Sequence, residues 1–424
     1  MKITAALIVA IFIFLNNVPP AYALASSAPP EIHGTGAYLI DVQSGQTLYS
    51  KNGDLQLQPA STTKIMTGLL AIENGKLDDV VTLSSTLLNY QIVYGTRIYL
   101  EPGEQMTLRN LLYALMLNSA NDAAVGIAEY IGGDLPHFVS MMNEKAKSLG
   151  LKDTTFKNPS GLTDNGHVTT AHDLARIAQA AYANATFRDY IQTQRYTIPR
   201  SKPNVPTEMI NENKLLGKDS YINGMKTGYT AAAQNCLVAS ASKDGRDLIG
   251  VILQSPGREI YTDMENLLDY GFTQFQTTEF KPSGSALSQL QIGKEQVNML
   301  LEKPILTTHK LGEANTEPIL KINSTSANLT QVNKGQVIGN VEVWDENEKL
   351  MDIPLVADRT ISPTPVNQGL FKTSKWGSYL FLLGILFFLL FLKEKSGRAN
   401  RRLRQARLKN EGSRIRESNN PDIS

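Results

Sequence analysis

The chain has 424 residues, and its 41 lysine and arginine residues nearly balance its 40 aspartate and glutamate residues, which leaves a formal net charge of +1. This overall balance gives no reason to expect nucleic-acid binding. The single cysteine, Cys236, excludes an intrachain disulfide, and we expect a buried, unreactive thiol because the residues after it are typical of a core strand. The five histidines show no metal-ligand spacing, so we expect neither a metal nor another cofactor.

Residues 1–23 are typical of a secretory signal peptide. Lys2 precedes an apolar run over 5–15, and the small residues at 21–23 form a cleavage site. The alternative is an uncleaved anchor helix, but the apolar run is short for that and ends in Asn16 and Asn17. We therefore predict an exported protein.

A β-hairpin is predicted over 37–50, with a polar turn at 43–46. It leads into a stretch after Pro59 whose apolar residues recur at helical spacing. Ser61 and Lys64 lie three residues apart near the start of this helix, which places a hydroxyl and an amine about one turn apart on the same face. A serine becomes a good nucleophile when a neighbouring base takes its proton, and a lysine provides that base when burial and nearby cations lower its pKa.

A second Ser-x-x-Lys match pairs Ser240 with Lys243. It lies in a stretch that predicts a β-hairpin, and residues three apart on a strand face opposite sides. The first match is therefore the one with useful geometry.

The segments that follow differ in the spacing of their apolar residues. Residues 65–190 are mostly helix-like and residues 195–255 return to strands, so the two strand groups predict one antiparallel sheet with helices packed on it, an α+β domain over residues 33–272. Short alternating segments over 273–360 predict a small, separate β-rich domain. Residues 361–375 contain Pro363 and Pro365 and predict a linker.

Residues 376–392 are apolar and uncharged, which predicts a transmembrane helix at the short end of the spanning range. A buried core helix is the alternative, but the segment is apolar all round and is followed by ten basic residues in the tail over 393–424. Positive charge stays on the cytoplasmic side, so we expect a single-pass protein of the cell membrane, with an extracellular body and a cytoplasmic C-terminus. The basic tail is interpreted as a topology signal, and the lipid bilayer is the predicted partner of the apolar helix.

Two further motifs follow Ser61 and Lys64 in chain order. Ser119 and Asn121 form a Ser-x-Asn motif after a helix-like stretch, and residues 226–228 read Lys-Thr-Gly. This set, in this order, occurs in penicillin-binding proteins and class A β-lactamases. Acyl transfer needs a nucleophile, a base, a proton route and an oxyanion hole, and the three motifs supply residue types suited to these tasks.

The chain resembles the D-alanyl-D-alanine carboxypeptidases, the low-molecular-mass penicillin-binding proteins related to penicillin-binding protein 5, over about residues 33–360. The segments similar to the family, besides the three motifs, are residues 158–162, 169–175, 237–241 and 257–259. The resemblance implies a transpeptidase-like, β-lactamase-like domain followed by the family's small β domain. It also implies peptidoglycan stem peptides ending in D-Ala-D-Ala as substrates, β-lactam antibiotics as ligands, and no cofactor.

Carried over residue by residue, the resemblance makes Ser61 the acylated nucleophile and Lys64 its base, with Ser119 completing the catalytic set. It implies that substrate is bound by Asn121, Lys226, Thr227, Gly228 and Arg258, the last through the terminal carboxylate. The oxyanion hole is expected from the backbone N–H groups of Ser61 and Tyr229. The sequence departs from the family at Ala120, where many members have glycine, and over 231–235, which leaves the substrate preference open.

Three other functions compete with a carboxypeptidase. A class A β-lactamase needs a glutamate followed four residues later by asparagine, and no such pair occurs between Ser119 and Lys226. A DD-endopeptidase of the same fold would use the same residues and stays open. A catalytically silent, membrane-tethered binding module is disfavoured by the intact set of motifs.

Overall fold

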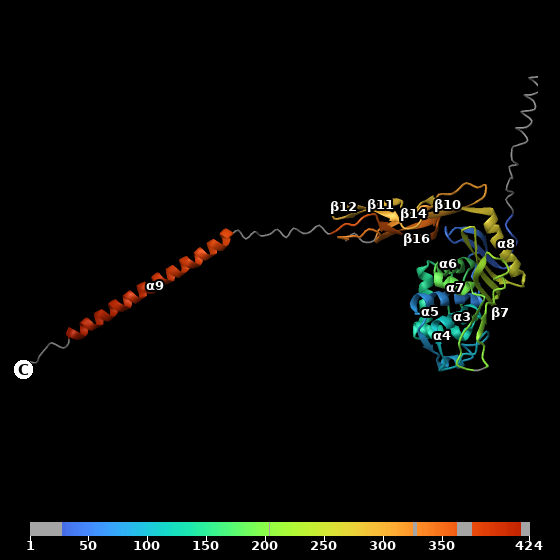
Figure 1. Cartoon of the computed structure of the whole chain (residues 1–424), viewed down its shortest axis with the longest axis horizontal. Helices are drawn as coiled ribbons and strands as arrows, with labels where there is room; N and C mark the ends of the chain where they lie inside the picture. Colours follow the sequence, from blue (N-terminus) through green and yellow to red (C-terminus); the bar gives the residue numbers. More distant parts are fainter. Residues whose placement is uncertain (1–27, 203, 325–328, 363–374, 417–424) are drawn as a thin grey trace, which may run out of the picture. The chain divides into compact units, whose positions relative to one another are not determined.

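The computed structural model describes residues 28–202, 204–324, 329–362 and 375–416 (Figure 1). The chain forms two units, one up to Thr360 and one from Ile361 onward. The predicted signal peptide, residues 1–23, lies outside the described residues, as does most of the predicted linker over 361–375.

The first unit is built on a five-stranded antiparallel sheet with the strand order β2-β1-β9-β8-β7. Its strands are β1 (Gly36–Asp41), β2 (Thr47–Lys51), β7 (Ile222–Thr230), β8 (Gln234–Lys243) and β9 (Arg246–Ser255). The N-terminal hairpin joins the later strands through β1 and β9, where Tyr38 pairs with Val251. The prediction that both strand groups form one antiparallel sheet is therefore confirmed.

Helices cover both faces of this sheet. They are α2 (Lys64–Asn74), α3 (Leu108–Met116), α4 (Asn121–Gly132), α5 (Leu135–Ser148), α6 (Ala171–Tyr182), α7 (Ala185–Gln192) and α8 (Glu259–Gln274). Figure 1 shows α3 to α7 gathered together and α8 apart from them. Ile40 faces the core formed with α2 to α7, whereas its neighbour Leu39 faces the core formed with α8. Every residue of β1 is buried because alternate side chains of a strand point to opposite faces and both faces are covered.

Shorter elements connect the helices. They are the 3₁₀ helices η1 (Ala60–Thr63) and η2 (Ser85–Leu88), and the paired strands β3 (Val80–Thr82) with β4 (Gln105–Thr107) and β5 (Arg195–Thr197) with β6 (Glu208–Ile210). Ser61 was predicted near the start of an α-helix, but it lies in η1 and the α-helix begins only at Lys64. Ala60 adopts a positive φ of 48°, so the chain changes direction immediately before the serine and the regular helix starts later.

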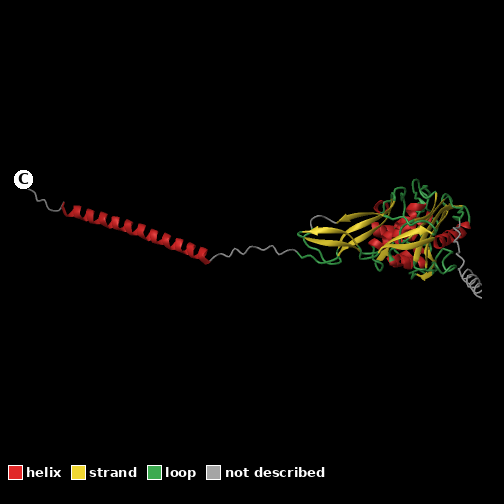
Figure 2. Cartoon of the chain, turned by 90° about the horizontal axis from the view of Figure 1, so that it is seen from above, coloured by secondary structure: helices red, strands yellow, loops and turns green. Residues whose placement is uncertain are grey.

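The segment after α8 contains only strands and loops among its described residues up to 362 (Figure 2). Strand β10 (Phe275–Lys281) pairs with β13 (Ile305–Lys310). The remaining strands form a sheet in the order β11 (Ala286–Ile292), β12 (Glu295–Leu301), β16 (Glu348–Ala357), β15 (Val337–Asp345) and β14 (Ile319–Ser324). Apolar residues such as Val341 and Val343 are buried on one face and alternate with more exposed residues, as expected for an antiparallel sheet with one covered face.

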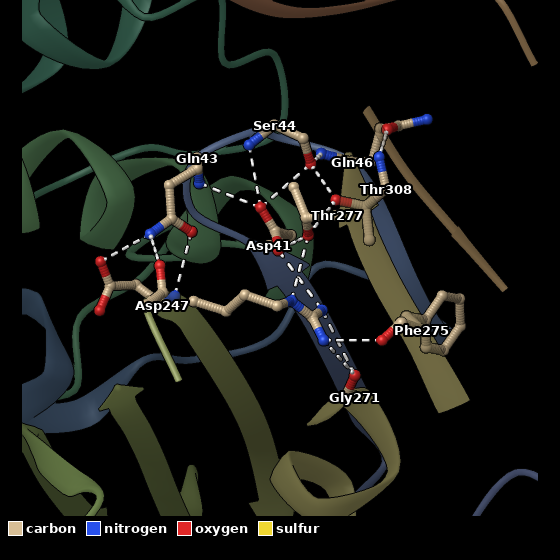
Figure 3. A network of polar contacts seen from close by, with 11 residues as sticks. Asp41, Gln43, Ser44, Gln46, Asp247, Gly271, Phe275, Thr277 and Thr308 are labelled. Carbon is tan, nitrogen blue, oxygen red and sulfur yellow. Dashed lines mark hydrogen bonds and ion pairs between the residues drawn. The ribbon is translucent and has the colours of Figure 1, made fainter. Parts of the chain in front are cut away.

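A buried polar network joins the turn after β1 to β10 and β13 (Figure 3). Asp41 is fully buried, and its carboxylate accepts hydrogen bonds from Ser44 N at 2.9 Å and from Thr277 Oγ1 at 2.8 Å. Arg246 lies 3.4 Å from the same carboxylate, and the hydroxyls of Ser44 and Thr308 are 2.7 Å apart. Because a buried carboxylate is costly unless it is paired and hydrogen-bonded, this network ties the β-rich segment to the sheet through directed contacts.

A second polar link joins α6 to β16. Glu348 forms ion pairs with Arg176 and with His172, whose Nε2 lies 2.9 Å from the carboxylate. Burial alone would raise the pKa of Glu348, but the hydrogen bond from His172 and the charge of Arg176 outweigh burial and lower this pKa to about 2.

The second unit contains one long helix, α9 (Lys375–Arg416). Within the described residues, Gly377–Arg398 is the one helical segment long and apolar enough to cross a membrane by length and composition. It includes the predicted span over 376–392 except for its first residue.

Candidate active site

The hydroxyl of Ser61 and the amine of Lys64 lie together at the junction of η1 and α2. Ser61 is half-buried and Lys64 is fully buried, with its Nζ atom 3.0 Å from Ser61 Oγ. One 3₁₀ turn thus brings the two groups within hydrogen-bond distance, as their spacing in the sequence predicts.

Lys64 has two further hydrogen-bond partners. Its Nζ atom lies 2.7 Å from Asn121 Oδ1 and 2.6 Å from the backbone oxygen of Ser160. The Asn121 amide donates its Nδ2 to the backbone oxygen of Tyr94 at 2.5 Å, so its oxygen is the atom that faces Lys64. Two partners therefore only accept hydrogen bonds, while the Ser61 hydroxyl is able to donate. A neutral amine, with two N–H groups and one lone pair, fits this set with its lone pair toward the Ser61 proton, whereas a protonated amine would donate to all three oxygens.

The electrostatic surroundings favour the same neutral form. Burial and the nearby Lys226 cation hold the pKa of Lys64 well below its usual value. Glu212 and Asp122 act in the opposite direction, but they do not outweigh burial. Burial and the charge of Lys226 thus both favour the uncharged amine, the form that is able to accept a proton from Ser61.

The loop over 158–162 supplies the carbonyl that orients Lys64. Asn158 Oδ1 accepts hydrogen bonds from the backbone N–H groups of Gly161 at 2.8 Å and Leu162 at 3.1 Å, which holds the loop in a tight turn. Gly161 has a φ of +84°, and a Cβ atom at this position would lie 1.8 Å from the backbone oxygen of Ala60. Only glycine fits here, because both the conformation and the close approach to η1 exclude a side chain.

Ser119 occupies the turn between α3 and α4. Its side chain is almost fully buried and its φ is +57°, an uncommon conformation for a residue other than glycine. Within the described residues its hydroxyl makes no hydrogen bond, so it is free to contact a substrate. Asn121, two residues on, begins α4 and makes the contact to Lys64.

Strand β7 runs beside η1 and carries Lys226, Thr227 and Gly228. The Lys226 side chain is buried, with Nζ 3.1 Å from the backbone oxygen of Thr227. A Cβ atom on Gly228 would lie 2.7 Å from Ser61 N, so the absence of a side chain leaves room beside this backbone N–H group. Tyr229 follows with an exposed side chain. The three predicted motifs thus meet around Ser61, although they are far apart in the sequence.

Comparison with known proteins shows to which protein family this chain belongs. A family model described as D-alanyl-D-alanine carboxypeptidase matches residues 23–257, and a model described as penicillin-binding protein 5, C-terminal domain, matches residues 275–362. The chain belongs to the D-alanyl-D-alanine carboxypeptidase family. It is a serine-type D-Ala-D-Ala carboxypeptidase and a penicillin-binding enzyme.

Curated relatives of this carboxypeptidase include DacF of Bacillus subtilis, which is 34% identical over 76% of this chain and 84% of the relative. DacC of Escherichia coli is 32% identical over 81% of this chain and 88% of the relative. Among solved structures, penicillin-binding protein 5 from Haemophilus influenzae matches with a TM-score of 0.61 at 28% identity, covering 79% of this chain and 99% of that structure. The Streptomyces K15 DD-transpeptidase matches with a TM-score of 0.54 at 32% identity, covering 58% and 99%.

Arg258 takes no part in the hydrogen bonds that join Ser61, Lys64 and Asn121 in the carboxypeptidase structure. It precedes α8 with an exposed side chain and makes no hydrogen bond or ion pair with any described residue. A surface ion pair with Glu259 or Asp263 was the alternative expectation for Arg258, and neither pair forms among the described residues; Asp263 pairs with His33 at 3.0 Å. A role in binding a substrate carboxylate thus remains a prediction for Arg258.

Ser240, from the second Ser-x-x-Lys match, and Cys236 are both part of the packed sheet. Ser240 lies on β8, and its hydroxyl donates to Asn223 Oδ1 at 2.7 Å, which confirms its predicted strand setting. Cys236 is buried, and burial raises the pKa of its thiol to about 12, which agrees with the predicted unreactive thiol.

Sequence reasoning missed two contributors to the site. One is the Ser160 carbonyl, since a backbone oxygen leaves no signal in residue types. The other is His167, whose Nε2 lies 3.0 Å from Thr63 Oγ1 while its Nδ1 accepts the backbone N–H of Lys157. Burial lowers the pKa of His167 to about 4. The ring is therefore neutral, and its contact with Thr63 helps to hold η1 in place. No cluster of metal-ligating residues occurs within the described parts of the chain.

Proposed function

We propose that this carboxypeptidase removes the terminal D-alanine of peptidoglycan stem peptides through an acyl-enzyme on Ser61. The observation that carries the proposal is the set of three partners around Lys64, which matches a neutral amine facing the Ser61 hydroxyl. Lys64 takes the hydroxyl proton as Ser61 Oγ attacks the carbonyl carbon of the penultimate D-alanine. The backbone N–H groups of Ser61 and Tyr229 receive the negative charge that develops on the carbonyl oxygen.

Collapse of the tetrahedral intermediate breaks the peptide bond. The proton held by Lys64 passes to the leaving amine, with the Ser119 hydroxyl as a relay, and free D-alanine departs. A water molecule then attacks the ester on Ser61 while Lys64 again accepts a proton, and the shortened peptide is released. In a β-lactam the same attack opens the ring, so the leaving amine stays attached to the acyl group and obstructs the incoming water.

The terminal carboxylate of the substrate is assigned to the β7 side of the site. Lys226 supplies a positive charge and Thr227 a hydroxyl, while Gly228 allows the substrate backbone to approach. Asn121 is engaged with Lys64 and Tyr94, so its role in this proposal is to position the base; its predicted contact with the substrate amide would need that hydrogen bonding to rearrange.

Substitution of Ser61 by alanine tests the assignment directly. Ser61→Ala should abolish covalent labelling by a fluorescent penicillin, whereas Ser240→Ala, in the second Ser-x-x-Lys match, should label normally. Persistent labelling of Ser61→Ala would refute the assignment. Analysis of products from isolated peptidoglycan then separates release of D-alanine from cleavage of cross-links, the activity of the DD-endopeptidase alternative.

We also infer the arrangement at the membrane. In this proposal the signal peptide at 1–23 directs export, residues 33–272 form the catalytic domain, residues 273–360 form the β-rich domain, and a linker over 361–375 precedes the span over 376–392. The basic tail over 393–424 stays in the cytoplasm. A chain truncated before Trp376 should be soluble and equally active on small peptides, and protease added to protoplasts should digest the body but not the tail. A membrane-bound truncated chain, or a tail digested from outside, would contradict this topology.

A further inference from the structure

Lys226 has one acidic partner among the described residues. Its Nζ atom lies 3.9 Å from Glu212 Oε2, and its side chain is only 1% exposed, whereas that of Glu212 is 43% exposed. The remaining contact of the amine is the Thr227 carbonyl. A buried cation with so few partners depends strongly on a single carboxylate.

The chain around Glu212 is held rigidly by its two neighbours. Asn211 Nδ2 donates to the backbone oxygens of Ile191 and Thr193, and Asn213 Nδ2 donates to the backbone oxygen of Gly224 on β7 at 2.9 Å. The backbone N–H of Glu212 itself donates to Leu117 O at 3.2 Å, two residues before Ser119. The backbone of Glu212 is therefore held between β7 and the turn that carries Ser119, and its partly exposed carboxylate lies 3.9 Å from the buried lysine.

We propose that Glu212 is a positioning residue for the carboxypeptidase reaction, and that its carboxylate keeps Lys226 charged so that Lys226 binds the terminal carboxylate of the substrate. The inference rests on the proposed function, which assigns that carboxylate to Lys226. Glu212 acts through Lys226, whose burial leaves its amine little access to water.

The charged groups around the pair determine the direction of the effect. Lys64 faces Lys226 from α2. Tyr261 is the group on α8 that interacts electrostatically with Glu212; Arg258 also acts on Tyr261, and Lys214 Nζ lies 5.8 Å from the centre of the Tyr261 ring. Burial lowers the pKa of Lys226 to about 8, and Glu212 opposes this decrease. Without the carboxylate the pKa of Lys226 falls further, so the lysine loses its charge at a lower pH. The same change lowers the pKa of Lys64, because Glu212 raises it.

The test compares the pH dependence of Glu212→Gln with that of the intact enzyme on a tripeptide ending in D-Ala-D-Ala and on its C-terminal amide. In the intact enzyme, KM for the acid should rise as the pH passes about 8, where Lys226 loses its proton. In Glu212→Gln this rise should begin about one pH unit lower. KM for the amide should show neither rise, because the amide has no carboxylate. The decrease in kcat at low pH, where Lys64 becomes protonated, should not move to higher pH in Glu212→Gln, because loss of the carboxylate lowers the pKa of Lys64.

Glu208→Gln provides the matched control, because Glu208 lies four residues earlier on β6 and is an exposed glutamate paired with Arg195. Its profiles should coincide with those of the intact enzyme. Glu212→Asp, which keeps the charge, should recover most of the original profile. The proposal is overturned if Glu212→Gln has an unchanged basic limb, or if it loses thermal stability and activity equally at every pH, as a purely structural residue would. Failure of the proposed function is distinguishable, since the intact enzyme would then not release D-alanine from the tripeptide.

Discussion

Gly161→Ala is a sharp test of how the 158–162 loop positions the catalytic lysine. The added Cβ atom would lie 1.8 Å from the backbone oxygen of Ala60 and 2.9 Å from Thr63 Oγ1. Contacts below 3.0 Å force a movement, so the loop and η1 must separate by about 1.2 Å. The loop also carries the Ser160 carbonyl, which lies 2.6 Å from Lys64 Nζ, and this contact would stretch or break.

The expected cost has two parts. A left-handed conformation makes alanine about 1 kcal/mol less favourable than glycine. The overlap with a packed backbone adds about 1–3 kcal/mol of lost stability. A displacement of about 1 Å at a catalytic group costs about 100-fold in rate, so acylation by penicillin should decrease on that scale.

Gly150→Ala carries the first part alone, so the difference between the two variants isolates the second. Gly150 has a φ of +78°, close to that of Gly161, but nothing lies within 4 Å of its added Cβ atom. Thermal unfolding and the rate constant for acylation should be measured for both variants. Gly150→Ala should lose only the conformational part and acylate normally. If Gly161→Ala is no worse than Gly150→Ala in either measurement, the argument that this loop positions Lys64 is incorrect.

Four further substitutions test other parts of the structure. Lys64→Ala should slow acylation by a factor of 10² or more, on the order of lost general-base catalysis, and near-normal acylation at neutral pH would reveal another base. Arg258→Ala should lower the preference for a free-acid peptide over its amide, and an unchanged ratio of cleavage rates would remove Arg258 from carboxylate binding. Asp41→Asn should cost about 2–3 kcal/mol in urea unfolding, because several donors around a buried carboxylate lose a charged acceptor, and a loss within error would show that the network contributes little. The pKa of Glu348 is about 2 in the folded protein and about 4.5 in the unfolded chain, so its ion pairs stabilise the fold fully above pH 4.5 and lose this effect as the pH falls toward 2. The melting temperature of Glu348→Gln should therefore decrease less steeply between pH 4.5 and pH 2 than that of the intact protein.

Local patterns in the sequence were enough to predict which segments form strands and which form helices. Alternating and helical spacing separated the strands from the helices. The start of α6 is equally local, since the Thr170 hydroxyl accepts the backbone N–H of Asp173 at 3.0 Å. The pairing of Ser61 with Lys64 followed from their spacing of three residues, because one turn of an α-helix or of a 3₁₀ helix brings residues three apart close together. These features depend on residues close in sequence, where backbone geometry alone fixes distance.

What only the tertiary structure decided is how segments far apart in the chain act on one another. Asn121 was predicted from the sequence to bind substrate, and the packing of α4 against α2 in addition directs its amide oxygen to Lys64. The Ser160 carbonyl and the His167 ring enter the site through a loop that no residue pattern connects to Lys64. The lowered pKa of Lys64 likewise depends on its complete burial and on a second lysine from β7, because desolvation and charge proximity are properties of the packed molecule and not of a spacing.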